Sequence, residues 1–189
     1  MARLYVIQTG QTRFETEGRL DSAVGAPLTE EGCQQVRNIA RSLQGQEISV
    51  VYCGQRESER QTADLLKEQL RVKEKIQKKL QEIDYGLWQG LTVEEIKRRQ
   101  PKIYRLWTHH PTDVCPPGGE SLQDMEQRLR HALRDVLKKH KKDAAALVLR
   151  PVAMGLLRCI LKGEPAEALW DQVDPEFTWS SYDTNGQRF

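Results

Sequence analysis

The chain has 189 residues, of which 38% are hydrophobic and 30% are charged, and its formal net charge is +2. This length suits one domain, residues 1–189, with a substantial buried core, and the small net charge argues against a nucleic-acid-binding or membrane-binding surface. No apolar run approaches the roughly 18 residues of a membrane span, and Met1-Ala2-Arg3 leads directly into a predicted strand rather than a signal peptide. We therefore expect a cytoplasmic globular protein that binds neither nucleic acid nor membrane.

Short apolar runs alternate along the chain with amphipathic helical patterns. Residues 3–7, 48–53 and 144–149 predict strands, and residues 177–182 predict a late one. Helices are predicted from Thr29 onward and over residues 57–70, 92–108 and 121–142. Such alternation predicts a single-domain α/β fold with a mostly parallel central sheet and helices on both faces.

The four cysteines lie far apart in the sequence, at Cys33, Cys53, Cys115 and Cys159. Neither the paired spacing of a zinc site nor a disulfide framework is present. We expect free, mostly buried thiols, no metal site and no cofactor.

Several phrases carry more specific information. The first predicted strand ends in Gln8-Thr9-Gly10, and Pro27-Leu28-Thr29-Glu30-Glu31-Gly32 follows. Further along, in chain order, come Glu59-Arg60-Gln61-Thr62-Ala63, Leu80-Gln81-Glu82-Ile83-Asp84-Tyr85-Gly86, Pro117-Gly118-Gly119-Glu120-Ser121 and Ala146-Leu147-Val148-Leu149-Arg150-Pro151-Val152. In this order the phrases resemble the histidine phosphatase superfamily, also called phosphoglycerate mutase-like.

The resemblance implies a catalytic set that is degenerate in this chain. The family has Arg-His-Gly at the end of the first strand, where the His is phosphorylated and the Arg grips the phosphate, whereas this chain has Gln8 and Thr9. The second catalytic His corresponds to Pro151, which lacks both a ring nitrogen and a backbone N–H. Only Glu82, which matches the proton-donating glutamate, is retained.

The same resemblance implies a remnant phosphate pocket. Arg60 matches the second phosphate-binding arginine, with a surface salt bridge as its alternative, and Gly10 keeps the turn that passes close to a ligand. Glu15 stands where the family commonly has an Asn, and either faces the phosphate or turns to solvent. Arg150 adds a positive charge if its side chain points inward. Without phosphate, we expect Arg60 and Glu82 to form an ion pair.

Three kinds of function remain open at this point. The first is a pseudoenzyme that binds an anionic metabolite or a protein partner at the remnant pocket. The second is a weak or altered phosphomonoester phosphatase or phosphoglycerate mutase-type enzyme, and the third is a structural or interaction subunit with a closed pocket. A threonine is a weak nucleophile without an activating base, so the sequence favours a protein that is not an enzyme. It also predicts that Trp88 lines the pocket beside Glu82. The ligand, the partner and the oligomeric state are not specified by the sequence.

Overall fold

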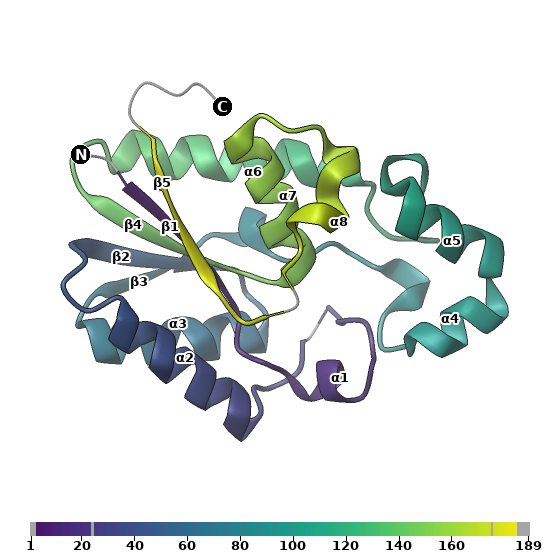
Figure 1. The fold of residues 1–189 in the computed structure, drawn as a ribbon, viewed down its shortest axis with the longest axis horizontal. Helices are drawn as coiled ribbons and strands as arrows, with labels where there is room; N and C mark the ends of the chain where they lie inside the picture. Colours follow the sequence, from purple (N-terminus) through teal and green to yellow (C-terminus); the bar gives the residue numbers. More distant parts are fainter. Residues whose placement is uncertain (1–2, 24, 175, 185–189) are drawn as a thin grey trace.

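The computed structural model describes residues 3–23, 25–174 and 176–184. Within these residues five strands form one sheet in the order β3-β2-β4-β1-β5 (Figure 1). The first four strands run parallel to their neighbours, and the last pairs antiparallel with β1. This arrangement confirms the predicted mostly parallel α/β fold. The strands are β1 (Arg3–Gln8), β2 (Ile48–Cys53), β3 (Lys73–Ile76), β4 (Ala144–Leu149) and β5 (Trp179–Asp183).

Helices connect the strands and cover the sheet. The α-helices are α1 (Arg13–Thr16), α2 (Glu30–Ser42), α3 (Glu57–Leu70), α4 (Val93–Arg99), α5 (Pro101–His109), α6 (Leu122–Lys139), α7 (Pro151–Lys162) and α8 (Leu169–Gln172). Single 3-10 turns occur at Lys78–Leu80, Gly86–Trp88, Pro111–Asp113 and Ala166–Ala168.

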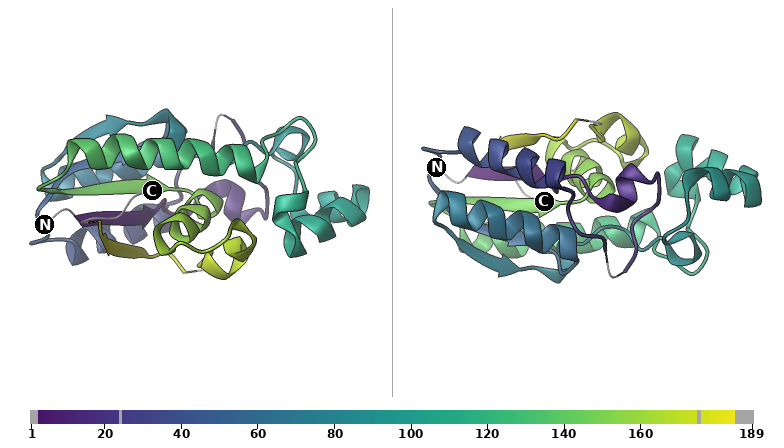
Figure 2. Two further views of the ribbon diagram at one scale, coloured as in Figure 1. Left: turned by 90° about the horizontal axis from the view of Figure 1, so that it is seen from above. Right: turned by 90° about the horizontal axis from the view of Figure 1, so that it is seen from below.

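The sheet lies between two helical layers. Side chains alternate along β1, so Leu4 and Val6 pack with α6 and α7, whereas Tyr5 and Ile7 pack with α2 and α3. Figure 1 shows the two layers on opposite sides of the sheet, and Figure 2 shows α4 and α5 projecting beyond its end. The parallel strands β1, β2 and β4 therefore present their carboxyl ends at one edge, where an open α/β sheet binds ligands.

The predicted elements match the structure closely, with three informative differences. The helix predicted over residues 92–108 is divided at Gln100, because Pro101 disfavours the helical conformation in the residue before it. Strand β3 was not expected, since its sequence Lys73-Glu74-Lys75-Ile76 has the charged character of an exposed edge. The late strand begins at Trp179, two residues after the predicted start.

The cysteines are all free, as predicted, but only two of the four are buried. These are Cys53 and Cys159, whereas Cys115 is exposed. Among the described residues no helix is long and apolar enough to cross a membrane. The location of the protein in the cell stays a prediction.

Two glycines bring α2 against the segment that follows β1. The side chain of Thr29 accepts a 2.9 Å hydrogen bond from Gly32 N–H and caps the helix. A Cβ atom on Gly32 would overlap the backbone of Gln11, and one on Gly10 would overlap the carbonyl of Gly32. This close backbone approach holds the residues after β1 at the edge of the sheet.

Gly32→Ala should therefore destabilise the fold. Forcing a methyl group into packed backbone typically costs about 1–3 kcal/mol, because atoms on both sides must move. Urea unfolding would measure the loss, with Asn38→Ala as the control because Asn38 is an exposed residue of the same helix. The control should change stability by less than about 0.5 kcal/mol. Equal stability of the Gly32→Ala and wild-type proteins would show that the contact is not tight.

Candidate functional site

The carboxyl ends of β1 and β4 lie side by side. Thr9 follows β1 and donates its backbone N–H to Leu149 O over 2.9 Å, so the two strands stay paired to their last residues. Gly10 then turns away and donates its N–H to Thr62 Oγ1 of α3 over 3.2 Å. Arg150 follows β4 and precedes Pro151, the first residue of α7. The residues predicted to replace the two histidines thus meet at one edge of the sheet.

Glu82 caps the N-terminus of α7. Its Oε2 accepts a 2.9 Å hydrogen bond from Val152 N–H, and its Oε1 accepts one of 3.0 Å from Ala153 N–H. Ile83 N–H adds a third bond of 2.8 Å to the same carboxylate. Burial raises the pKa of Glu82, against the opposing effects of Arg150 and of these backbone donors. This carboxyl group, only 2% exposed, is therefore occupied by a helix terminus, where negative charge is favourable.

Arg150 points inward and is surrounded by oxygen atoms. Its Nη1 donates to Thr9 Oγ1 over 3.3 Å and lies 3.3 Å from Glu15 Oε1, and its Nε lies 3.5 Å from Asp21 Oδ2. Although burial lowers the pKa of Arg150, the nearby carboxylates of Glu15 and Asp21 outweigh it and raise the pKa overall. The sequence left open whether Arg150 points inward or outward, and the structure has the inward pose, with the residue only 3% exposed.

A second buried arginine completes the cluster. Arg56 Nη1 forms a 2.8 Å ion pair with Asp21 Oδ2, the same oxygen that lies near Arg150. Its Nη2 also donates to the backbone oxygens of Glu82 and Ile83 over 3.3 and 3.4 Å. Asp21 therefore stands between two guanidinium groups. We call Asp21, Arg56 and Arg150 the buried charge cluster.

Sequence reasoning missed Asp21 and Arg56 and misplaced Arg60. Asp21 and Arg56 lie in connecting segments, where charged residues are common and no pattern distinguishes them. Arg60 is an exposed residue of α3, whereas the carboxylate of Glu82 is bonded to α7, so the expected ion pair between them is wrong. Trp88 lies in the core and donates its Nε1–H to Gln100 over 2.9 Å instead of lining a cavity beside Glu82.

The sequence left open whether Glu15 faces the phosphate site or turns to solvent, and the structure places it between these two positions. Its Oε2 accepts hydrogen bonds from the backbone N–H and the hydroxyl of Thr12, over 2.7 and 3.0 Å. These bonds complete a capping box at the start of α1. Its other oxygen pairs with Arg150, and its side chain is 30% exposed. Glu15 therefore faces the site with its charge partly in solvent.

Several buried polar atoms of this region lack a hydrogen-bond partner in the described part of the chain. They are Ser58 Oγ, Glu59 Oε1 and Arg150 Nε; a fourth such atom, Glu164 Oε2, lies elsewhere. Ser58 and Glu59 are neighbours on α3, and Glu59 Oε2 accepts the backbone N–H of Arg56 over 3.0 Å. Incompletely satisfied polar groups of this kind are typical of functional sites and costly in a purely structural core.

A cavity of about 310 Å³ opens beside Thr9. Its lining comes from the end of β1, from α1 and α2, from the start of α7 and from the segment between α8 and β5. The lining residues are Gln8, Thr9, Gln11, Glu15, Gln35, Pro151, Val173, Asp174 and Phe177. Of the predicted site residues, Gln8, Thr9, Glu15 and Pro151 line it. Gly10, Arg60, Glu82 and Arg150 do not. We call it the Thr9 cavity.

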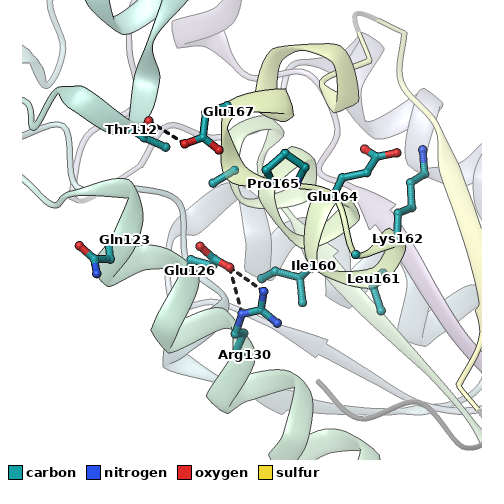
Figure 3. A pocket seen from close by; sticks show the side chains of 12 residues that line it. Thr112, Gln123, Glu126, Arg130, Ile160, Leu161, Lys162, Glu164, Pro165 and Glu167 are labelled. Carbon is teal, nitrogen blue, oxygen red and sulfur yellow. Dashed lines mark hydrogen bonds and ion pairs between the residues drawn. The ribbon is translucent and has the colours of Figure 1, made fainter.

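A larger cavity, of about 770 Å³, lies near the opposite end of α7 (Figure 3). Its walls include the Glu126–Arg130 ion pair and the hydrogen bond from Thr112 to Glu167. Since α7 has 12 residues, its two ends are roughly 18 Å apart. This cavity is therefore separate from the site at the strand ends. Among the described residues no group of three or more His, Cys, Asp or Glu side chains is arranged to hold a metal ion.

Glu59 should make stability depend on pH. Burial raises its pKa from 4.5 to about 7. Between these values the folded protein keeps a proton that the unfolded chain has lost, so stability falls as pH rises. Glu59→Gln should flatten this decline and stabilise the protein above pH 7, by up to about 3 kcal/mol. The pH dependence of stability that remains in the Glu59→Gln variant includes the contribution of Glu82, whose pKa is also raised.

Melting temperatures between pH 5 and pH 8 would measure this effect. Glu57→Gln is the matched control, because Glu57 is exposed on the same helical turn. It should follow the wild-type curve. The assignment fails if the Glu59→Gln and wild-type curves are parallel.

Known proteins with related sequences include phosphatases and probable phosphoglycerate mutases. The chain is 27% identical to phosphoserine phosphatase 1 of Hydrogenobacter thermophilus over 170 residues, which cover 90% of this chain and 81% of the relative. It is 26% identical to adenosylcobalamin/alpha-ribazole phosphatase of Escherichia coli over 187 residues, covering 99% and 92% of the two chains.

Solved structures agree with the fold. YhfR of Bacillus stearothermophilus matches with a TM-score of 0.91 at 24% identity, over 98% of this chain and 93% of the other. A putative alpha-ribazole-5'-P phosphatase of Escherichia coli matches with a TM-score of 0.87 at 26% identity, over 98% and 91%. The family model of the histidine phosphatase superfamily, branch 1, matches residues 4–189 of this chain. The chain belongs to the histidine phosphatase superfamily.

Proposed function

We propose that this protein is a non-catalytic member of the superfamily whose phosphate site is closed by its own carboxylates. The observation that carries the proposal is the position of Asp21, whose Oδ2 lies 2.8 Å from Arg56 and 3.5 Å from Arg150. Both buried guanidinium groups are thus already paired with a carboxylate of the protein itself. Among the three kinds of function considered, this favours an interaction subunit or a binding protein with a closed anion site.

The chemistry at Thr9 supports the absence of catalysis. Its Oγ1 accepts a hydrogen bond from Arg150, a permanent cation that does not remove a proton. A threonine hydroxyl needs a base or a metal ion to become a nucleophile, and the partner seen here supplies neither function. Loss of a nucleophile that acts as part of a unit costs about 10⁶-fold in rate in a well-studied hydrolase. Turnover should be undetectable.

Electrostatics also oppose the entry of a phosphate dianion. A phosphate would have to displace Asp21 from the arginines while facing Glu15. Two like charges at about 4 Å repel by about 4 kcal/mol at an effective dielectric constant of 20. Gln8 adds no charge to offset this repulsion, because an amide is neutral where the family has an arginine.

Glu82 has a structural function under this proposal. In the resembling family the matching glutamate donates a proton to the leaving group. Here its two oxygens accept three backbone N–H groups at 2.8–3.0 Å, and it does not line the Thr9 cavity. The backbone donors stabilise the ionised form, although burial outweighs them and raises the pKa of Glu82 overall. Glu82 is poorly placed to deliver a proton because both of its oxygens are bonded to backbone N–H groups away from the cavity.

The proposal predicts that the purified protein hydrolyses neither p-nitrophenyl phosphate nor phosphoserine and does not interconvert phosphoglycerates. Turnover should equal a buffer blank. Thr9→Ala and Arg150→Met separate the protein's own activity from a contaminant's, since contamination would not respond to changes in this chain. Phosphatase activity that co-purifies with the wild type and is lost in either folded variant would overturn the proposal in favour of an altered phosphatase.

A further inference from the structure

The Thr9 cavity has an unusual charge for a member of a phosphate-binding family. Its described lining contains two carboxylates, Glu15 and Asp174, and no lysine, arginine or histidine. Glu15 is paired with Arg150, which lies behind it. Asp174 uses Oδ1 to accept the backbone N–H of Glu176 over 3.0 Å, and Oδ2 has no hydrogen bond within the described part of the chain. The cavity therefore presents at least one uncompensated negative charge.

The same lining contains an amide with no hydrogen bond to a described residue. The side chain of Gln8 is only 9% exposed, yet its amide forms no hydrogen bond with any described residue. An amide offers two N–H donors and a carbonyl acceptor, and none of these is used by a described residue. Gln8 lines the cavity, so a molecule in the cavity can supply the missing partner. This observation is independent of the charge on Glu15 and Asp174.

Three of the other lining residues are apolar. Phe177 and Val173 come from the segment between α8 and β5, and Pro151 comes from the start of α7. An aromatic ring attracts both hydrocarbon and cationic groups, the latter through its negative face. At about 310 Å³ the cavity is at the lower end of the usual range for small-molecule sites, roughly 300–1,000 Å³.

We infer that the Thr9 cavity binds a small organic ammonium ion with a short apolar part. The ammonium group lies toward Asp174 and Glu15, the carbonyl oxygen of Gln8 accepts one of its N–H bonds, and the apolar part packs against Phe177 and Val173. The inference rests on the proposed function, because a cavity that still bound phosphate would not favour a cation. It replaces the anionic ligand expected from the family resemblance by one of opposite charge.

Calorimetric titration with three compounds of one shape tests the inference. Benzylammonium is the positive probe, benzyl alcohol the neutral one and benzoate the negative one, all at the same ionic strength. Benzylammonium should bind most tightly, benzyl alcohol more weakly and benzoate not at all. Absence of benzylammonium binding, or tighter binding of benzoate, overturns the inference.

Three variants locate the site. Asp174→Asn should weaken benzylammonium binding by about fivefold and leave benzyl alcohol unchanged, because it removes only charge. Phe177→Ala should weaken both compounds, because it removes the apolar wall. Glu176→Gln, an exposed neighbour outside the lining, is the matched control and should change neither. If benzylammonium binds equally well to folded wild-type and Asp174→Asn protein, the inference is wrong.

These outcomes are separable from those of the proposed function. Phosphatase turnover dependent on Thr9 or Arg150 would overturn the absence of catalysis, whatever the amine titrations give. A failure of benzylammonium to bind, with turnover still at the blank, would remove only the assignment of the ligand class.

Discussion

Two guanidinium groups buried at the ends of parallel strands must have counter-charges close by. An unpaired buried charge costs far more free energy than a folded domain can spare, and folded domains are stable by only about 5–15 kcal/mol. Arg56 and Arg150 meet this requirement through Asp21, which reaches both of them, and through Glu15, which reaches Arg150. The charge cluster makes the ends of β1 and β4 compatible with burial in the absence of a bound anion.

The rest of the site follows from this requirement. Thr9 gives Arg150 a hydrogen-bond acceptor, and Glu82 neutralises the N-terminus of α7 directly after that arginine. Positions that would hold or protonate a phosphate in the resembling family therefore have internal partners here. What remains open is the adjacent cavity, whose walls carry amides, carboxylates and apolar groups. The strand ends are thus filled by internal pairs, and the Thr9 cavity lies beside them.

The sequence predicted the architecture better than the site. Apolar runs and helical spacing report burial directly, which is why the strands at residues 48–53 and 144–149 and the helix at residues 57–70 match the structure. Gln8 ends β1 and Pro151 follows β4 closely, and both line one cavity because the carboxyl ends of parallel strands meet at one edge. The ion pairs of the site were not predicted, since they join residues that are far apart in the chain.

The error at Arg60 has a geometric cause. The buried face of α3 includes Ser58, Thr62 and Leu66, which follow helical spacing. Arg60 lies two positions from Thr62, about 200° around the helix axis, and so faces solvent. The match to the family motif placed Arg60 in the pocket, whereas the helical periodicity of α3 places Arg60 on the solvent side. Arg56 and Asp21 had no such signal, because each lies in a connection whose path only the folded chain defines.

The effect of inorganic phosphate on the Asp21→Asn variant tests the central claim most directly. Melting temperatures would be measured with and without phosphate at constant ionic strength, beside wild type and Glu17→Gln, whose partners Arg13 and Arg19 are on the surface. Asp21→Asn should melt lower, since breaking a buried pair costs about 3–5 kcal/mol, and phosphate should raise its melting temperature by binding the released arginines. Phosphate should leave the wild type and the Glu17→Gln control unchanged. A phosphate-induced rise of equal size in the wild type would contradict the claim that Asp21 closes the anion site.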